Sequence, residues 1–498
     1  MGYYENCCQI CGVSFNLARC RTKYEAAEAG WGYSNGLYYF GDTSSCLETD
    51  EEGGCEDITV NGVENVHIAG LGCIFNGGYS GHRISVEEIK NMRLSRYIIK
   101  KPKNAPEEKD AADYEKCSDF FITDQTTTTQ NHYEPGNLPR DRYGVGSFFP
   151  QNYLVIDDEG EFFGVPVHDA CWKIFERVSK LRLGRVDLQG FMALWYRSAC
   201  GTCGFQTIKQ EPIVNECKQQ FWSHVPGTEY LAANPHDIVG FSRMALESYH
   251  YAPRHRRNDQ GVYMGKPCCR IPPRSVYVNP TDPFSKLPLE IKNMILFNLQ
   301  AKDIGSLRYV SRGFHQLSQQ VFRHLILKEL PWFWEIDELQ QRKLEQTRKM
   351  YVIQFGDGLS RLEEGNWDDE HKQFVKDCVA LKPQSLDWKA IYDRVKILQK
   401  GILGVRNRAR IWELVERITE RIGKLRESSS SQKRYDLRDE EDLLSARATI
   451  EEMENDLVNE GFDCLDCHSY QIERIVNDCQ THQIERMADD EEMEDQDY

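Results

Sequence analysis

Two cysteines near the N-terminus, Cys8 and Cys11, are separated by two residues, and a glycine follows the second. Two thiolates on one tight turn can fill two corners of a tetrahedral zinc site. His67 and Cys73 are the best candidates for the other two corners, so we predict a structural zinc site with the ligands Cys8, Cys11, His67 and Cys73. The alternatives are buried thiols without metal, or ligands among the competing cysteines Cys7, Cys20, Cys46 and Cys55.

A second set of candidate zinc ligands lies near the C-terminus. Cys464 and Cys467, followed after eleven residues by Cys479 and His482, have a finger-like spacing. The flanking sequence is acidic and holds few aliphatic or aromatic residues, which argues against a packed domain around them. A disordered tail is therefore the default interpretation, and a second zinc site is the alternative.

Two further cysteine patterns suggest chemistry that the rest of the sequence does not support. Cys200 and Cys203 form a C-x-x-C pair, but a redox dithiol requires a βαβ setting, so we interpret both as structural thiols. His168 and Cys171 lie one helical turn apart, as a catalytic pair could. No oxyanion glycine motif or orienting partner accompanies them. We therefore interpret Cys171 and the adjacent Trp172 as residues of the core.

The composition of the chain excludes several classes of protein. The chain has 498 residues, 18 cysteines and a formal net charge of −17. This charge argues against a binder of nucleic acids or membrane surfaces, because both need an excess of Lys and Arg against phosphate. No apolar stretch approaches the roughly 18–20 residues of a membrane span, and the N-terminus has no features of a secretory signal. We expect a reducing compartment, the cytoplasm, the nucleus or both.

The elements that would position these residues are mixed in the first part of the chain. Short apolar runs bounded by Gly and Asn or Asp predict strands over 37–40 and 63–68. Ser85 with Glu88 has the form of a capping box, and apolar residues at three-residue spacing follow, so a helix is predicted over 85–97.

The middle of the chain also predicts both strands and helices. The polar stretch 123–142 contains two prolines and predicts a loop. Two apolar runs, 153–156 and 162–165, flank an acidic glycine turn and resemble a hairpin. One continuous apolar face predicts a helix over 168–183, and the Pro-rich and basic stretch 254–280 indicates a connector.

Helices dominate from Asp282 onward. The first is indicated by an apolar residue at every fourth position, Leu287, Ile291, Ile295 and Leu299. A second helix would begin at Asp303, a suitable N-cap, and would carry one apolar stripe, Leu307, Val310, Phe314 and Leu317. A third would face inward with Val321, Phe322, Leu325 and Ile326. Together these predict a small three-helix module.

Further helices are predicted downstream over 338–352, 388–399 and 406–425. The last has the most regular pattern of the chain, with an apolar seam of Ile411, Val415, Ile418, Ile422 and Leu425. Four consecutive serines at 428–431 begin a linker. The final residues, 488–498, include seven Asp or Glu and no Lys or Arg, which predicts a disordered acidic tail.

These patterns predict an α+β fold. It consists of a mixed, Cys-rich α/β N-terminal half, a three-helix module, an all-α C-terminal region and a disordered acidic tail. The predicted domains are a Cys-rich, zinc-stabilised domain, a mixed α/β region with loops, the three-helix module, a helical region, and the linker with the tail. Their boundaries are 1–125, 126–280, 281–330, 331–427 and 428–498.

The three-helix module resembles an F-box. It has, in order, Leu-Pro-x-Glu-Ile from Leu287, an aliphatic residue at Ile295, Leu299, Leu-Arg-x-Val-Ser from Leu307, and an aromatic residue at Phe314. The resemblance implies a module that docks on the adaptor of SCF-type ubiquitin ligases, which in turn bridges to a cullin scaffold. Such a small unit cannot bury every apolar residue it holds, although packing within this chain is the alternative use for them. The expected adaptor-binding residues are Leu287, Pro288, Leu289, Ile291, Ile295, Leu299, Leu307, Val310 and Phe314.

The resemblance extends beyond the F-box to most of residues 1–425. The stretch 327–335 resembles a segment that follows the F-box in a group of F-box proteins from filamentous fungi. Asp387-Trp388 and Arg406-Asn407-Arg408 resemble motifs of the same group. The cysteine-bearing stretches 8–19 and 67–73 also resemble recurrent elements of it.

We therefore predict a substrate-recruiting subunit of an SCF-type E3 ubiquitin ligase without an active site of its own. Its expected partners are the adaptor, the cullin scaffold and an unidentified protein substrate held by the regions that flank the F-box. Neither nucleic acid nor membrane is expected as a partner. The alternatives are a zinc-stabilised interaction protein outside a ligase and a metal or cysteine enzyme. Against the enzyme, no nucleophile, base and orienting group can be assembled from the sequence.

Overall fold

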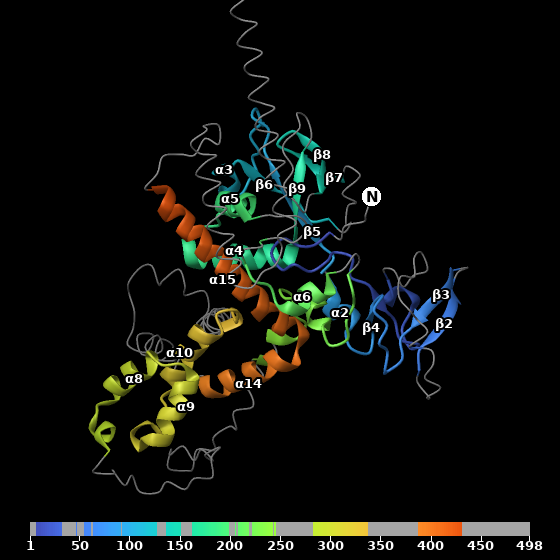
Figure 1. Ribbon diagram of the computed structural model, residues 1–498. Coiled ribbons are helices and arrows are strands. Elements are labelled where there is room, and N and C mark those ends of the chain that lie inside the picture. The colour runs from blue at the N-terminus through green and yellow to red at the C-terminus, as the bar shows by residue number, and fades with distance from the viewer. Residues whose placement is uncertain are drawn as a thin grey trace, which may run out of the picture. The chain divides into compact units, whose positions relative to one another are not determined.

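The chain divides into two compact units (Figure 1). Unit 1 comprises Met1–Asp237 and Arg410–Tyr498, and unit 2 comprises Ile238–Ala409. The computed structural model describes the residues 6–31, 46, 54–60, 63–90, 92–126, 136–150, 162–198, 205, 208–218, 222–242, 244–245, 282–336 and 387–430.

A five-stranded sheet forms one part of unit 1. Its order is β6 (Phe120–Ile122), β5 (Ser95–Lys100), β9 (Phe163–His168), β8 (Val145–Pro150) and β7 (Gly136–Arg142). All neighbouring strands are antiparallel except β8 and β9, which are parallel. The central strand β9 is buried from its second residue onward, as expected for a strand covered on both faces.

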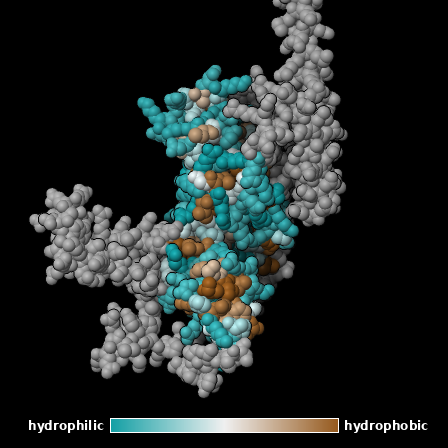
Figure 2. Space-filling view, turned by 90° about the vertical axis from the view of Figure 1, so that its left-hand side faces the viewer, coloured by the Kyte–Doolittle hydropathy of each residue, from teal (hydrophilic) through white to brown (hydrophobic). Residues whose placement is uncertain are grey.

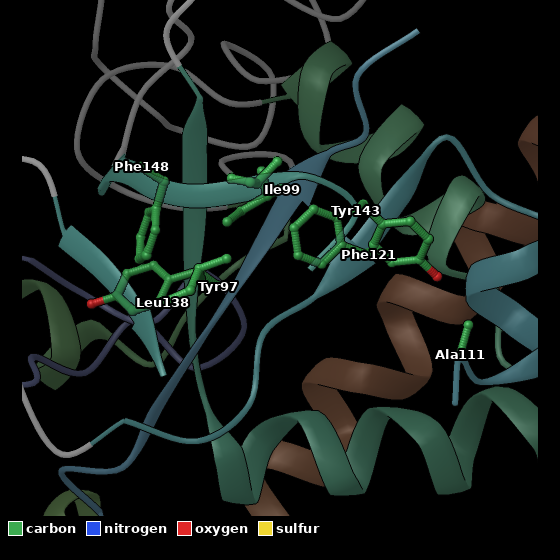
Figure 3. Packing of buried hydrophobic residues seen from close by; sticks show 8 residues of the cluster. Tyr97, Ile99, Ala111, Phe121, Leu138, Tyr143 and Phe148 are labelled. Atoms are coloured by element: carbon green, nitrogen blue, oxygen red, sulfur yellow. The ribbon is translucent and has the colours of Figure 1, made fainter. Parts of the chain in front are cut away.

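The core of this sheet is built from large apolar side chains of four of its strands (Figure 3). Each such side chain stabilises the fold by roughly 1.5–3 kcal/mol when it is fully buried. The cluster consists of Tyr97, Ile99, Ala111, Phe121, Leu138, Tyr143, Val145 and Phe148. One ion pair lies beside it, with Arg142 Nη2 at 2.6 Å from Glu115 Oε2 and both side chains buried.

A two-residue turn connects β7 and β8 and sets their register. Tyr143 and Gly144 both have positive φ, 53° and 77°, between the paired residues Arg142 and Val145. Two successive positive φ values match the right-handed twist of a hairpin, although they are costly for tyrosine. The Tyr143 side chain is buried in the core and its backbone N–H donates to Glu108 Oε1 at 3.0 Å, which offsets that cost.

Three helices complete this part of unit 1. Helix α4 (Asp169–Leu183) follows β9 directly and ends at Gly184, whose φ of 75° gives a left-handed C-cap. Helix α5 (Leu188–Ser198) comes next. The long helix α15 (Leu403–Ser430) lies alongside both, and in unit 1 it makes an ion pair from Glu416 to Arg182 of α4 (Figure 1).

The Cys-rich part of unit 1 has short elements. β1 (Arg19–Cys20) pairs in parallel with β4 (Tyr79–Ser80), and β2 (Glu56–Val60) forms an antiparallel hairpin with β3 (Val63–Ile68). The other named elements among the described residues of unit 1 are the helices α2 (Val86–Ile89), α3 (Asp113–Lys116) and α6 (Pro212–Cys217) and two 3-10 turns, Ala27–Ala29 and Glu229–Ala232.

Lowering the pH is expected to destabilise unit 1 through His224, which is buried as a neutral ring. The backbone N–H of Ala18 donates to its Nε2 at 2.9 Å, and its Nδ1 donates to the carbonyl of Asn76 at 3.0 Å. Burial lowers the pKa of His224 to about 4, because the charged ring would be desolvated in the core. A second ring proton, on Nε2, would also face the Ala18 N–H. In the unfolded chain a histidine has a pKa of about 6.5. The contribution of the neutral His224 to the free energy of unfolding is therefore complete above about pH 6.5, and up to about 3 kcal/mol of it is lost as the pH falls toward 4.

Chemical denaturation across this pH range measures the effect. His224→Gln should be less stable than wild type at pH 7 but should lose less stability on acidification. The exposed His82 is the control, since His82→Gln should keep the wild-type pH dependence. An unchanged slope in the His224 variant would contradict the assignment.

Unit 2 is helical. A 3-10 turn, Pro283–Lys286, leads to α8 (Leu289–Phe297) and α9 (Ala301–Val310), and a second turn, Arg312–Phe314, leads to α10 (Gln319–Glu329). Helix α14 (Trp388–Gly401) packs against α10, where the Tyr392 hydroxyl donates to Glu329 Oε2 at 2.7 Å. The first residues of α15 also belong to this unit.

The α+β fold predicted from the sequence is confirmed, as is its change to helices from residue 282 onward. The strand at 63–68 and the helices at 168–183, 388–399 and 406–425 are all present as β3, α4, α14 and α15. The capping box is also confirmed, since the Glu88 N–H donates to Ser85 Oγ and the Ser85 N–H donates to Glu88 Oε2.

Other sequence predictions need correction. The helix predicted over 85–97 ends at Ile89, because Ser95–Lys100 is rich in β-branched and aromatic residues and pairs on both sides as β5. The loop predicted over 123–142 contains β7. The run at 162–165 pairs with β5 and β8, and its expected hairpin partner at 153–156 lies outside the described residues. Helix α9 begins after Gln300, so Asp303 lies in its first turn and is not its N-cap.

Several predicted segments lie outside the described residues. They are the strand at 37–40, the helix at 338–352, the connector at 254–280, Cys200 with Cys203, and the C-terminal residues that include Cys464, Cys467, Cys479 and His482. The sequence analysis placed a domain boundary at residue 125. In the structure one sheet crosses that boundary, because it contains β5 and β6, which precede residue 125, and β7, β8 and β9, which follow it.

Candidate functional site

The three-helix region of unit 2 is tied together at its start by Asp282. Its Oδ1 accepts from the Phe284 N–H at 3.0 Å, and its Oδ2 accepts from Ser311 Oγ at 2.9 Å and from the Gly313 N–H at 3.1 Å. Burial opposes ionisation, but these hydrogen bonds outweigh it and lower the pKa of Asp282. The carboxylate therefore holds the turn before α8 against the turn after α9.

Apolar side chains are exposed on the helices that this carboxylate joins. Of the nine residues predicted to bind the adaptor, Pro288, Leu289, Ile291 and Val310 are exposed, and Leu287, Ile295, Leu299 and Leu307 are half-buried. Val310 is 80% exposed, which is unusual for an aliphatic residue in a helix. Figure 2 shows an apolar area low on the side of the molecule that carries α8. These eight residues are available for contact with another protein.

Phe314 differs from the other eight residues. Its side chain is 1% exposed, and its ring packs against that of Phe284 with centroids 5.3 Å apart. The aromatic residue at this position thus fills the core where the turn before α8 meets the turn after α9. Phe314 therefore lies in the core of unit 2 and not on its surface.

Two exposed apolar residues were missing from the sequence prediction. Met294 on α8 is 60% exposed and Tyr309 on α9 is 94% exposed. The sequence did carry a signal for both, since Met294 lies three positions after Ile291 and Tyr309 directly precedes Val310. We use the name apolar face of unit 2 for the exposed apolar residues of α8 and α9, which are Leu289, Ile291, Met294, Tyr309 and Val310.

A buried arginine joins the segment after α10 to the start of α15 within unit 2. Arg408 Nη1 lies 2.6 Å from Glu335 Oε1, and its guanidinium lies 3.8 Å from the centroid of the Trp334 ring. The centroid of the Phe241 ring lies 5.4 Å from the same guanidinium carbon. The two sequence motifs at 327–335 and 406–408 therefore contact each other directly.

Unit 1 contains two clusters that could each hold a metal ion. The first consists of Cys8, Cys11, His168 and Cys171, and the second consists of Cys46, Cys55, His67 and Cys73. Within each cluster the candidate ligand atoms all lie within 4.8 Å of one another. Only Cys55 is not fully buried.

The first cluster joins the N-terminal segment to the start of α4. His168 Nδ1 lies 3.3 Å from Cys11 Sγ and 3.9 Å from Cys171 Sγ, and the His168 N–H donates to Cys8 Sγ at 3.2 Å. Burial raises the pKa of the Cys171 thiol. Burial alone would also raise the pKa of Cys11, but hydrogen bonds from Cys171 and Cys8 and the charge of His168 hold it well below its usual range.

His168 responds to the same neighbours. Burial alone would lower its pKa, but its electrostatic and hydrogen-bond interactions with the side chains of Cys8 and Cys11 raise it to about 10. The cluster therefore places a protonated histidine ring beside the Cys11 thiolate in a fully buried position. A divalent cation can replace protons in such a set of ligands.

The second cluster lies between the β2–β3 hairpin and the loop that follows it. His67 Nδ1 lies 3.1 Å from Asp57 Oδ1, and Nε2 lies 3.5 Å from Cys73 Sγ. Burial lowers the pKa of His67 and raises those of Cys55 and Cys73. A neutral His67 donates its Nδ1 proton to the carboxylate and directs the Nε2 lone pair toward the sulfur.

The ligand set predicted from the sequence is divided between these two clusters. Cys8 and Cys11 lie in the first, and His67 and Cys73 lie in the second. The partners of the first pair are His168 and Cys171, which the sequence analysis assigned to the core. The partners of the second pair are Cys46 and Cys55, which it named as competing ligands. The single predicted site is thus replaced by two candidate sites.

Residues 284–332 match the family model of the F-box domain. The chain therefore contains an F-box domain, and the helices α8, α9 and α10 belong to it. Comparisons with curated proteins and with solved structures gave no match. F-box domains bind the adaptor subunit of SCF complexes, and F-box proteins are generally non-catalytic receptors that bring substrates to a ubiquitin ligase. In the described part of the chain, no helix is long and apolar enough to cross a membrane.

Proposed function

We propose that the chain is the substrate-recruiting subunit of an SCF-type E3 ubiquitin ligase. The observation that carries the proposal is the apolar face of unit 2, which lies within the F-box domain and is exposed on α8 and α9. Ile291 and Met294 are three residues apart on α8 and lie on one side of that helix, which is the spacing at which a helix presents apolar anchors to a groove on the adaptor. The cullin scaffold would be reached through that adaptor.

In this function the chain supplies proximity and no catalytic group. It would raise the effective concentration of lysines of a bound protein near a ubiquitin-loaded enzyme. Unit 1 has its own sheet and core, so we propose that it holds the protein target, with neither nucleic acid nor membrane as a partner. We also propose that the chain acts in the cytoplasm, the nucleus or both.

We further propose that zinc stabilises unit 1. Thiolate and imidazole ligands in a tetrahedral arrangement are typical of structural zinc sites, and both clusters offer three sulfurs and one ring nitrogen. Four protein ligands per cluster, all buried except Cys55, leave no open position for a substrate, which favours a structural role over a catalytic one.

Replacing Leu289 by glutamate is expected to abolish most of the adaptor binding. A carboxylate placed in an apolar contact would be desolvated without a partner, at a cost of at least about 2 kcal/mol, or roughly thirtyfold in affinity. Titration of the purified full chain with the adaptor gives the affinity, and co-purification with adaptor and cullin tests the assembly.

The chain offers a matched control for this substitution. Leu327 on α10 is exposed to a similar degree as Leu289, 50% against 57%, but it is not part of the apolar face. Leu327→Glu should bind the adaptor as wild type does, and both variants should unfold at wild-type temperature. Equal binding of the adaptor by wild type and Leu289→Glu would contradict the proposed docking face. Absence of adaptor binding by wild type would contradict the ligase function.

A further inference from the structure

We propose that unit 1 binds two zinc ions at two separate Cys3His sites. Site 1 has the ligands Cys8, Cys11, His168 and Cys171, and site 2 has the ligands Cys46, Cys55, His67 and Cys73. The inference rests on the proposal above that the metal is zinc, and it is independent of whether the F-box binds an adaptor. It adds the number of ions, both ligand sets and a different task for each site.

The backbone of the N-terminal turn positions two ligands of site 1. The Gly12 N–H donates to the carbonyl of Cys8 at 2.8 Å, and the φ of 73° at Gly12 requires glycine. A Cβ atom there would also meet Val214 Cγ1 at 3.1 Å. This turn brings the thiols of Cys8 and Cys11 to the same side, as a zinc knuckle requires.

The other two ligands of site 1 come from the junction of β9 and α4. His168 ends β9, and Cys171 lies in the first turn of α4, one turn further along. A contact outside the ligands holds the two segments together, since the Gln9 N–H donates to the carbonyl of Pro166 at 2.9 Å. Trp195 Nε1 of α5 donates to Gln9 Oε1 at 2.9 Å and fixes the turn from another side. The four ligands are therefore positioned by more than their own contacts.

The imidazole of His168 is the strongest indication of a ligand at site 1. Its Nδ1 faces sulfur atoms, and its Nε2 has no hydrogen-bond partner among the described residues. Nδ1 lies 3.3 Å from Cys11 Sγ and 3.9 Å from Cys171 Sγ, so it is the ring nitrogen that can share a cation with the two sulfur atoms. With a cation at Nδ1, the ring proton stays on Nε2.

Site 2 has an outer partner of the kind that zinc-binding histidines have. Asp57 and His67 are directly opposite each other in the β2–β3 hairpin, so strand pairing itself sets their contact. A carboxylate on one ring nitrogen fixes the tautomer and orients the other nitrogen toward the metal. The Gly70 N–H donates to Cys55 Sγ at 3.4 Å, and the Cys73 N–H donates to the Gly70 carbonyl at 3.2 Å, so the loop folds around the sulfurs.

The two sites have different tasks because their ligands are spaced differently along the chain. Cys11 and His168 are 157 residues apart, so site 1 connects the N-terminal turn to the central strand of the sheet. The ligands of site 2 all lie within residues 46–73, so this site closes a local loop. Loss of site 1 should affect the sheet of unit 1, whereas loss of site 2 should affect only the β2–β3 region.

Metal analysis of the purified full chain tests the stoichiometry and the ligands. We expect about two zinc ions per chain in wild type and one in each of Cys11→Ser/Cys171→Ser and Cys55→Ser/Cys73→Ser. Cys7 and Cys20 provide controls, because Cys7 adjoins Cys8 and Cys20 packs in the same cluster as Cys73 without being a ligand. Cys7→Ser and Cys20→Ser should each retain two ions.

X-ray absorption at the zinc edge of the wild-type protein keeps the test independent of variants that fail to fold. We expect an average of three sulfur and one nitrogen ligand per zinc. One ion or none per chain, an average of four sulfurs, or loss of an ion from Cys20→Ser would overturn the proposed ligand sets. Because no adaptor is present in these measurements, their failure is distinct from failure of the ligase function.

Discussion

Removal of zinc from the full chain is expected to unfold much of unit 1 while the F-box domain stays folded. Structural zinc sites contribute roughly 10–16 kcal/mol of apparent binding free energy, comparable to or larger than the roughly 5–15 kcal/mol stability of a whole domain. Without the ions, each cluster leaves three cysteine side chains and a histidine ring, all buried except Cys55, with no metal to bind. Unit 2 has no such cluster among its described residues.

Hydrogen exchange of the chelated protein measures this expectation segment by segment. Amides of the N-terminal turn, of β9 and of the β2–β3 hairpin should exchange at least a hundredfold faster than in the zinc-loaded chain. Amides of α8 and α10 should be unchanged, and these helices serve as the internal reference. Re-addition of zinc should restore protection.

The ligand-pair variants separate the two sites in the same measurement. Cys55→Ser/Cys73→Ser should expose the β2–β3 hairpin and leave β9 protected, whereas Cys11→Ser/Cys171→Ser should expose β9 and its neighbours β5 and β8. Uniform protection in chelated and zinc-loaded protein would show that the clusters are ordinary core thiols.

The sequence could predict half of each metal cluster but not their pairing. Cys8 and Cys11 are recognisable because both ligands lie on one turn, where spacing alone determines geometry. Their partners His168 and Cys171 carry the matching H-x-x-C spacing, yet only the fold of the sheet brings that junction to the N-terminal turn. Spacing along the chain contains no information about such a contact.

In the F-box the sequence identified the module but did not predict which of its apolar residues are buried. The order of its apolar residues was sufficient to identify the module, whereas their burial was not predictable from helical period alone. On α8 the buried positions are Asn293 and Leu296, and the stripe through Ile291 and Ile295 is exposed or half-buried. A helix with apolar residues on most sides does not reveal which side a partner covers.

Replacing Arg408 by methionine is expected to destabilise unit 2 by about 3–5 kcal/mol, because it leaves a buried carboxylate without its charge partner. Glu335 is 5% exposed, and among the described residues its Oε2 has no hydrogen-bond partner, so its charge is balanced through Oε1 and Arg408. The same change removes the cation that stacks on the Trp334 ring at 3.8 Å, a contact worth about 2 kcal/mol when it is desolvated.

A surface arginine provides the matched control. Arg323 lies over the Trp388 ring at 5.9 Å in the same unit, but it is exposed. Its replacement by methionine should cost no more than about 1 kcal/mol, the value of an exposed cation–π contact. Chemical denaturation followed by the fluorescence of the unit 2 tryptophans compares the two variants.

A double-mutant cycle distinguishes the ion pair from the stacking. Glu335→Gln removes the charge but keeps the shape, so in the Arg408→Met background it should restore part of the lost stability, with a coupling of at least about 2 kcal/mol. If the two changes simply add, the stabilisation comes from packing on Trp334 and not from the pair. Adaptor affinity, measured well below the unfolding temperature, should be unchanged in all these variants, because the Arg408 cluster is buried and shares no residue with the apolar face. A parallel loss of affinity would mean that the segment after the F-box sets the geometry of the docking helices.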